Sequence, residues 1–270
     1  MIYLKDDELQ VISDYIKDNY GINLTKKKQL IEGRLSNHIS GLGFDNYMDY
    51  FEYAKKDKTS GEITVLLNKL TTNHTYFFRE RAHFDFYENT VLPWIDKKLR
   101  SRDLRVWSAG CSTGQEAYTL AMITLNYLGA SAGIWDSTIL ASDISEKALT
   151  AAKQGIFSRD DLSEIPNSWL RRYFVSCGDD KFRVSETLRK NVAFRNFNLL
   201  SPFAFKKPFQ AIFCRNVMIY FDIPAKNGII QKFYDALLPG GYLFIGQSES
   251  LSCCEHKFSF VKPSIYQKKS

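Results

Sequence analysis

The sequence predicts an α/β fold in which a doubly wound, mostly parallel sheet follows an N-terminal helical domain. Strand-like apolar runs at 104–107, 137–143, 192–198 and 209–214 alternate with segments of helix-like apolar spacing. This alternation is typical of βα units around a parallel sheet. Pro239-Gly240-Gly241 then predicts a turn into a last strand, 242–245, and so a terminal hairpin.

The first 70 residues carry only helical patterns. The first helix has apolar side chains three to four residues apart, at Leu9, Ile12, Ile16 and Tyr20. Gly21 ends it, and Thr25 is a suitable N-cap for a second helix. Two more helices follow, through Tyr47–Tyr53 and Ile63–Leu70. We therefore expect a helical domain over 1–72 and a second domain over 73–270.

Composition excludes several classes of protein. The 270 residues carry a net charge of +6, and no apolar run approaches the ~18 residues that a membrane span needs. The acidic, amphipathic N-terminus does not resemble a signal peptide. Five cysteines without C-x-x-C spacing favour a reducing cytoplasm over disulfides or zinc, and the four histidines show no metal-ligand spacing. We expect a cytoplasmic protein without a metal site.

The second helix is basic. It contains Lys26, Lys27, Lys28 and Arg34 against one acid, Glu32. Such a charge run is usually a solvated face, and the alternative is a docking surface for an acidic partner.

Residues 70–84, LTTNHTYFFRERAHF, place five polar side chains directly before three aromatic ones. A helix cap followed by an aromatic staple accounts for part of this pattern. Three consecutive aromatic residues exceed what a linker needs, so a binding role is the alternative.

A run of small residues, 108–114, separates the first strand from a helix. Its glycines, Gly110 and Gly114, do not form the dinucleotide motif G-x-G-x-x-G. Such a loop lets a ligand approach the backbone, where we expect free N–H groups at the helix N-terminus. It could also be a plain tight turn.

Polar residues also end the other strands. Asp143 follows the second strand, where an acid grips ribose hydroxyls in many parallel sheets, although it could equally cap the helix that Ser145 opens. Asn198 ends the third strand and Cys214-Arg215 the fourth. Because parallel strands end at one edge of a sheet, we expect these residues to converge on one pocket. A helix and a hairpin with the short turn 177–180 are inserted at about 158–190.

These residues resemble the CheR family, S-adenosylmethionine-dependent methyltransferases that methylate glutamate side chains of bacterial chemoreceptors. The resemblance rests on LTTNHTYFFRE (70–80), VWSAGCSTGQEAY (106–118), ASDIS (141–145), FNLL (197–200), FQAIFCRNVMIYFD (209–222) and LLPGGYLFIGQSESL (237–251). It implies a Rossmann-like class I methyltransferase domain after the helical domain.

The resemblance also implies roles for individual residues. Arg79 at the mouth of the site and Tyr220 close to the transferred methyl group would be the catalytic residues, which orient the reacting groups. The cofactor would contact Asn73, Thr75, Arg79, Gly110, Gly114, Glu116, Asp143, Asn198, Leu199, Cys214 and Arg215. Gln115 stands where many relatives have an acid, which leaves Glu116 as the expected acid.

The resemblance implies a chemoreceptor helix as partner, met by the helix with Lys26, Lys27, Lys28 and Arg34. The short inserted turn suggests a protein that does not depend on a receptor C-terminal peptide. We also expect a monomer. Two alternatives stay open: a non-catalytic module that binds S-adenosylmethionine, and a methyltransferase acting on nucleic acid. Basic residues do not interleave with aromatic ones as in nucleic-acid platforms, so we expect no nucleic-acid partner.

Overall fold

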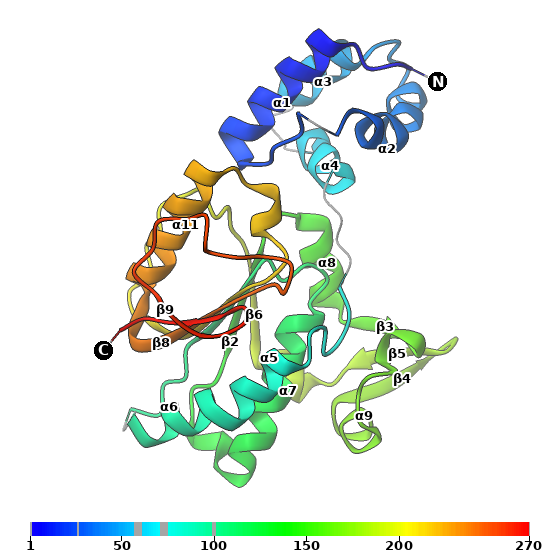
Figure 1. The fold of residues 1–270 in the computed structure, drawn as a ribbon. Coiled ribbons are helices and arrows are strands. Elements are labelled where there is room, and N and C mark those ends of the chain that lie inside the picture. The colour runs from blue at the N-terminus through cyan, green and yellow to red at the C-terminus, as the bar shows by residue number, and fades with distance from the viewer. Residues whose placement is uncertain (1, 26, 57–60, 71–74, 99–100, 270) are drawn as a thin grey trace.

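A computed structural model describes residues 2–25, 27–56, 61–70, 75–98 and 101–269. Its helical domain lies at one end of a larger α/β domain, and a small three-stranded sheet projects from the α/β domain at the right of the view (Figure 1). Among the described residues, no helix has the length and apolar character needed to cross a membrane.

The helical domain has its own apolar core. Residues such as Ile16, Leu35, Phe51 and Leu67 are almost fully buried together. As the periodicity predicted, Gly21 ends the first helix, with its φ of 72° in the left-handed region. The helices are α1 (Asp6–Tyr20), α2 (Lys28–Gly41), α3 (Tyr47–Lys56) and α4 (Gly61–Leu70).

The predicted start of the second helix was wrong. Helix α2 begins at Lys28, and its N-cap position is Lys27, without a side-chain cap. Thr25 instead donates its hydroxyl to Asn23 Oδ1 at 2.7 Å and also donates its backbone N–H to that oxygen. This local Asx-type turn competes with helix capping for the same side chain.

The central sheet of the second domain confirms the doubly wound prediction. The strand order is β6-β2-β1-β7-β8-β10-β9; neighbours among the first five strands pair in parallel, and β10 pairs antiparallel with both β8 and β9. Their bounds are β1 (Val106–Ala109), β2 (Ile139–Asp143), β6 (Val192–Asn196), β7 (Phe209–Cys214), β8 (Leu237–Ile245), β9 (Ser259–Lys262) and β10 (Ile265–Gln267).

Alternate strand residues serve opposite faces of this sheet. Phe213 and Phe244 stack at 4.1 Å on the face covered by α5 (Ala82–Phe86), α6 (Leu92–Lys98), α7 (Gln115–Leu128) and α8 (Glu146–Gln154). Trp107 and Ile212 point to the other face, covered by α11 (Ile223–Ala236). The buried sheet therefore provides a rigid base for the loops at its carboxyl edge.

The C-terminal prediction needs correction. Pro239-Gly240-Gly241 is not a turn but lies inside β8, where the pairing with β7 shifts register between Phe209 and Ala211. Gly240 and Gly241 pair their backbones with Lys268 instead. The terminal hairpin is formed by β9 and β10, which the sequence reading missed.

The inserted element is a three-stranded antiparallel sheet in the order β3-β5-β4. It comprises β3 (Ile156–Ser158), β4 (Phe174–Gly178) and β5 (Lys181–Val184), together with α9 (Asn167–Tyr173); α10 (Glu186–Lys190) then leads back to the main sheet. Asp179 and Asp180 alone connect β4 to β5, both with positive φ. The turn is therefore as short as the sequence predicted.

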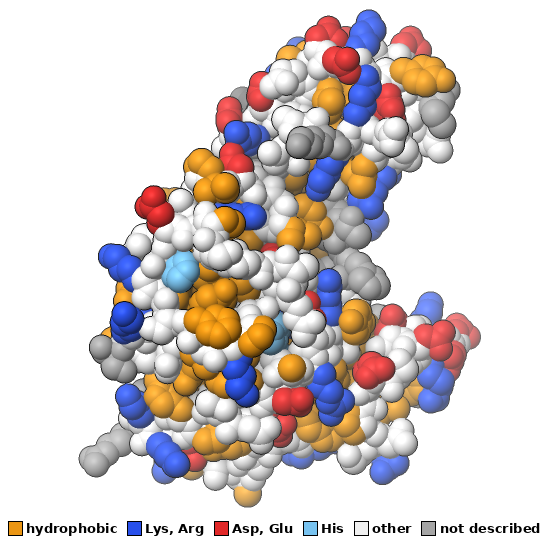
Figure 2. Space-filling model, viewed as in Figure 1, with side chains coloured by type: hydrophobic (Ala, Val, Ile, Leu, Met, Phe, Trp, Pro, Cys, Tyr) orange, Lys and Arg blue, Asp and Glu red, His pale blue; other side chains and the backbone are white. Residues whose placement is uncertain are grey.

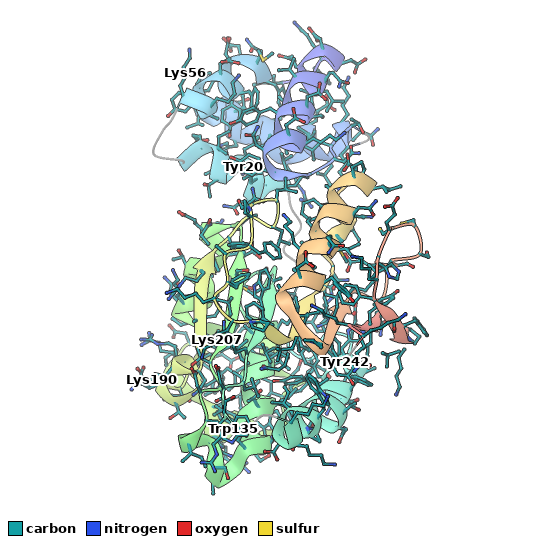
Figure 3. The ribbon with its side chains drawn as sticks, turned by 90° about the vertical axis from the view of Figure 1, so that its left-hand side faces the viewer. Tyr20, Lys56, Trp135, Lys190, Lys207 and Tyr242 are labelled. Atoms are coloured by element: carbon teal, nitrogen blue, oxygen red, sulfur yellow. The ribbon has the colours of Figure 1, made fainter. Side chains whose placement is uncertain are left out.

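The two domains meet beside the carboxyl edge of the main sheet. Asn23 donates its backbone N–H to the Tyr220 carbonyl at 2.9 Å, and Lys17 pairs with Asp222 at 3.0 Å. A Cβ on Gly21 would lie 2.5 Å from the Phe221 ring, so this close contact requires glycine. In Figure 3, Tyr20 lies at the end of the helical domain that faces the α/β domain.

Candidate active site

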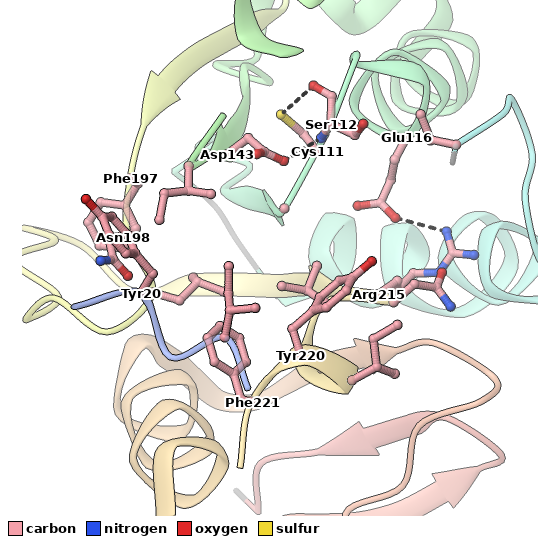
Figure 4. Close-up of a pocket in the computed structure, with 18 of the residues that line it drawn as sticks. Tyr20, Cys111, Ser112, Glu116, Asp143, Phe197, Asn198, Arg215, Tyr220 and Phe221 are labelled. Carbon is pink, nitrogen blue, oxygen red and sulfur yellow. Dashed lines mark hydrogen bonds and ion pairs between the residues drawn. The ribbon is translucent and has the colours of Figure 1, made fainter. Parts of the chain in front are cut away.

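A cavity of about 400 Å³ lies where the ends of β1, β2 and β7 meet the helical domain (Figure 4). Its volume is in the range of small-ligand and cofactor sites. The residues around it are Tyr20, Ile22, Lys27, Thr75, Tyr76, Arg79, Gly110, Cys111, Ser112, Glu116, Asp143, Ile144, Phe197, Asn198, Leu199, Arg215, Asn216, Val217, Ile219, Tyr220 and Phe221. The predicted convergence of strand ends on one pocket is therefore present.

Gly110 forms part of the cavity wall and cannot carry a side chain there. Its φ is 100°, and a Cβ would lie 2.3 Å from Val217 Cγ2. Gly114 has a φ of 97° but does not line the cavity; a Cβ on it would meet Ala152 at 3.0 Å. Gly114 therefore allows α7 to approach α8, while Gly110 shapes the cavity.

The N–H groups of Gly110, Cys111 and Ser112 are not free for a ligand, whereas the expectation for the N-terminus of α7 stays a prediction. Gly110 and Cys111 donate their N–H groups to the Ser142 carbonyl at 2.7 and 2.9 Å. Ser112 donates its N–H to Asp143 Oδ2 at 2.8 Å. The neighbouring strand β2 thus occupies these three donors of the loop.

Asp143 ends β2 and faces the cavity. Burial raises the pKa of its carboxyl, although the backbone N–H groups of Ser112 and Ser145 stabilise the charged form. The helix cap is not Asp143 but Ser145, whose hydroxyl accepts from Ala148 N–H. The buried Ser112 hydroxyl beside Asp143 has no hydrogen-bond partner among the described residues. Together these oxygens fit a ligand with neighbouring hydroxyl groups.

Glu116 is held on the opposite side. Its carboxylate accepts from the Ser108 hydroxyl at 2.6 Å and pairs with Arg215 Nη1 at 3.0 Å. Arg215 also pairs with Glu80 at 3.1 Å, so one cation serves two carboxylates. Burial raises the pKa of Glu116, against the lowering effect of Arg215. The cluster carries a net negative charge when both carboxylates are ionised, which suits a cationic ligand.

Arg79 lies in a turn whose backbone Arg215 contacts. Arg215 Nη2 donates to the Arg79 carbonyl, and the Arg79 guanidinium lies 6.0 Å from the Tyr76 ring centroid. Thr75 and Arg79 both line the cavity. Asn73, predicted beside them, lies outside the described residues.

Asn198 and Leu199 also line the cavity, although β6 ends at Asn196, two residues earlier than predicted. Asn198 donates to the Asn19 carbonyl at 3.0 Å and accepts from Leu200 N–H. This residue therefore ties the cavity wall to the end of α1.

Tyr220 lies at the end of a short 3₁₀ turn, Met218–Tyr220, on the helical-domain side of the cavity. The Lys27 ammonium lies 4.9 Å from its ring centroid, a cation–π distance. Cys214, by contrast, is fully buried in β7 and does not line the cavity. Its side chain packs in the core of the sheet, and the cavity lining does not support its predicted cofactor contact.

Sequence reasoning missed the contribution of the helical domain to this cavity. Tyr20, Ile22 and Lys27 line it, together with Phe221 from the α/β domain. The sequence held one indirect signal, the glycine at position 21 that ends α1 and lets the chain approach Phe221.

A doubly wound parallel sheet, an acid at the end of β2 and a small-residue loop after β1 define a Rossmann-like domain that binds a nucleoside cofactor, the class that includes the S-adenosylmethionine-dependent methyltransferases. The paired carboxylates and the unpartnered Ser112 hydroxyl fit a cofactor with ribose hydroxyls and a positive charge.

Comparison with known families is consistent with this class. Residues 73–267 match the family described as "CheR methyltransferase, SAM binding domain", and residues 7–71 match "CheR methyltransferase, all-alpha domain". The chain belongs to the CheR methyltransferase family, and its cofactor is S-adenosylmethionine.

Curated relatives extend over nearly the whole chain. A chemotaxis protein methyltransferase of Borreliella burgdorferi is 40% identical over 99% of this chain and 96% of its own length. Relatives of the same name from Escherichia coli and Klebsiella aerogenes are 36% and 37% identical, each over 97% of this chain and 91% and 90% of their own lengths.

Proposed function

We propose that this protein transfers the methyl group of S-adenosylmethionine to glutamate side chains of chemoreceptors, giving glutamyl methyl esters and S-adenosylhomocysteine. The observation that carries the proposal is a cavity with acidic groups in its wall and Arg79 and Tyr220 beside them, in a chain related to chemotaxis methyltransferases. The domain division proposed is 1–72 and 73–270, with the insertion at about 158–190.

In this proposal Asp143 and Ser112 hold the ribose hydroxyls, while Glu116, neutralised in part by Arg215, faces the charged end of the cofactor. The other proposed cofactor contacts are Asn73, Thr75, Arg79, Gly110, Asn198 and Leu199. Gly114 and Cys214 support the site through packing.

The chemistry needs little proton transfer. A glutamate with an ordinary pKa near ~4.3 is already ionised at neutral pH, so no general base is required. When bound, the cofactor supplies an activated sulfonium methyl group; a C–O bond forms as the C–S bond breaks, and the sulfur leaves as a neutral thioether. In-line positioning of this kind can contribute on the order of 7–11 kcal/mol.

We assign Arg79 and Tyr220 to positioning the reacting groups rather than to neutralising the nucleophile. A tight ion pair would stabilise the ground-state carboxylate more than the transition state, in which charge is cancelled. Arg79→Ala should therefore lower the rate of transfer at saturating cofactor. Loss of cofactor binding with an undiminished rate at saturation would contradict this role.

For receptor docking we propose the basic surface of α2. Lys27 lies at the cavity, and Lys28 pairs with Asp6 at 2.5 Å in an exposed ion pair that a partner could readily replace. Arg34 donates to the Lys69 carbonyl and so borders the same domain's α4. Lys26, the fourth predicted cation, lies outside the described residues.

The short, acidic β4–β5 turn supports a mode of docking that does not depend on a receptor C-terminal peptide. Arg159 pairs with Asp180 at 3.0 Å and holds this turn against the insert. Isothermal titration with an isolated receptor tail peptide should show no tight binding; a tight complex would refute this part of the proposal.

The proposed setting is a cytoplasmic monomer without a nucleic-acid partner. On the face that Figure 2 shows, Lys and Arg side chains are dispersed over both domains and do not form the continuous basic stripe of a nucleic-acid surface.

The test is transfer of tritium from methyl-labelled S-adenosylmethionine to membranes that contain chemoreceptors, followed by mild base. Base-labile label on the receptor band is the expected result and identifies a carboxyl methyl ester. Cofactor binding without such label would favour a non-catalytic module. Label on added RNA or DNA would favour the nucleic-acid alternative.

A further inference from the structure

Glu249 lies in the loop after β8 and contacts the segment 216–220, which contains Tyr220. Its Oε2 accepts from the backbone N–H of Gly246 at 2.6 Å and of Asn216 at 2.9 Å. Its Oε1 accepts from the N–H of Ile219 at 3.1 Å. A single carboxylate therefore joins the β8 loop to both ends of the turn that follows β7.

The segment needs this support because its backbone is unusual. Asn216 has a φ of 59°, a left-handed conformation that costs energy for a residue with a side chain. The backbone N–H groups at the start of the 3₁₀ turn, Met218–Tyr220, have no carbonyl acceptor in a preceding turn of helix. Glu249 satisfies them, as a capping acid does at a helix N-terminus.

A second contact indicates that the arrangement is built rather than incidental. A Cβ on Gly246 would lie 2.8 Å from the Asn216 backbone nitrogen, so the close approach of the two loops requires glycine. Glu80 bonds the same two loops, through the Asn216 amide at 3.3 Å and the Gln247 N–H at 3.1 Å. Glu249 is thus the second of two carboxylates that join these loops.

We propose that Glu249 is a positioning residue for methyl transfer, which holds the 216–220 turn so that Tyr220 faces the reacting groups. This inference rests on the proposed function. Only a carboxylate suits the position: it offers acceptors on both oxygens, whereas a glutamine would point an NH₂ group at backbone N–H donors.

The experiment compares Glu249→Gln with Glu255→Gln, the same change at an exposed side chain six residues away. Receptor methylation is measured at saturating cofactor, and S-adenosylhomocysteine affinity by calorimetry. Glu249→Gln should lower kcat about tenfold or more, since small misplacements of a positioning group have such effects. The dissociation constant should change by less than about threefold, because Glu249 does not line the cavity and a positioning role lowers kcat rather than affinity.

Tyr220→Phe completes a double-mutant cycle that a general loss of stability would not mimic. If Glu249 acts through Tyr220, adding Glu249→Gln to Tyr220→Phe should lower kcat by no more than about a further twofold. Multiplicative losses would overturn the inference, as would an unchanged kcat in Glu249→Gln.

Two further controls keep the outcomes distinct. If thermal unfolding shows that Glu249→Gln does not fold, Glu249→Asp replaces it in the double-mutant cycle. Aspartate keeps the negative charge, but its side chain is one methylene shorter. If the native chain and Glu255→Gln both fail to methylate receptors, the proposed function is wrong and the inference falls with it. If both are active and the Glu249 variants are equally active, only the inference is wrong.

Discussion

Lowering the pH from 7 to 5 should destabilise the folded chain through His83. This imidazole is only 2% exposed and packs against the Phe244 ring. Burial and the nearby Arg215 guanidinium lower its pKa from 6.5 to about 4, although the Glu80 carboxylate, 3.4 Å from Nδ1, opposes the shift. His83 is therefore neutral in the fold at a pH where it is protonated in the unfolded chain.

The sign and size follow from proton linkage. Between pH 6.5 and 4 the unfolded state binds one more proton at His83, so the free energy of unfolding falls as the pH is lowered through 6.5. One pKa unit corresponds to about 1.4 kcal/mol. The full difference of 6.5 to about 4 then amounts to about 3 kcal/mol, of which about 2 kcal/mol is lost between pH 7 and 5.

Urea unfolding at pH 7, 6 and 5 measures this effect. His83→Gln, which cannot titrate, should lose about 2 kcal/mol less than the native chain over that range. His256→Gln, a change at an exposed imidazole, serves as the control and should keep the native pH dependence. Equal slopes for the native chain and His83→Gln would refute the reasoning.

Two other substitutions test the cavity wall and the ion cluster. Gly110→Ala places a Cβ 2.3 Å from Val217 Cγ2 at a φ of 100°. Calorimetry should therefore show weaker S-adenosylhomocysteine binding, and urea unfolding should show a free energy of unfolding lower by about 1–3 kcal/mol. Native affinity would contradict the place of Gly110 in the cavity wall. Arg215→Met leaves Glu80 and Glu116 without their cation and should cost about 3–5 kcal/mol at pH 7. That deficit should shrink as the pH is lowered toward 5, because the stranded carboxyls can then take up protons; a deficit independent of pH would contradict it.

Features that depend on neighbours in the chain were readable from the sequence. Gly21 ends α1, Ser145 caps α8 and Asp143 ends β2 because helix periodicity, capping and strand termination act within a few residues. The motifs around Tyr220 and Thr75 carried the family resemblance for the same reason. Local reasoning failed where two local options competed, as at Thr25, whose hydroxyl bonds to Asn23 rather than capping α2.

Other features required the folded chain, because they depend on which distant segments come together. Glu249 and Asn216 are bonded across 33 residues, and Asn198 and Asn19 across 179. No periodicity or spacing reports such contacts, since strand order and domain packing bring them about. The same holds for Arg215, whose charge is shared by Glu80 and Glu116. The class of protein was thus encoded locally, whereas the wall of its cavity and the support beneath Tyr220 arise only when the sheet edge and the helical domain meet.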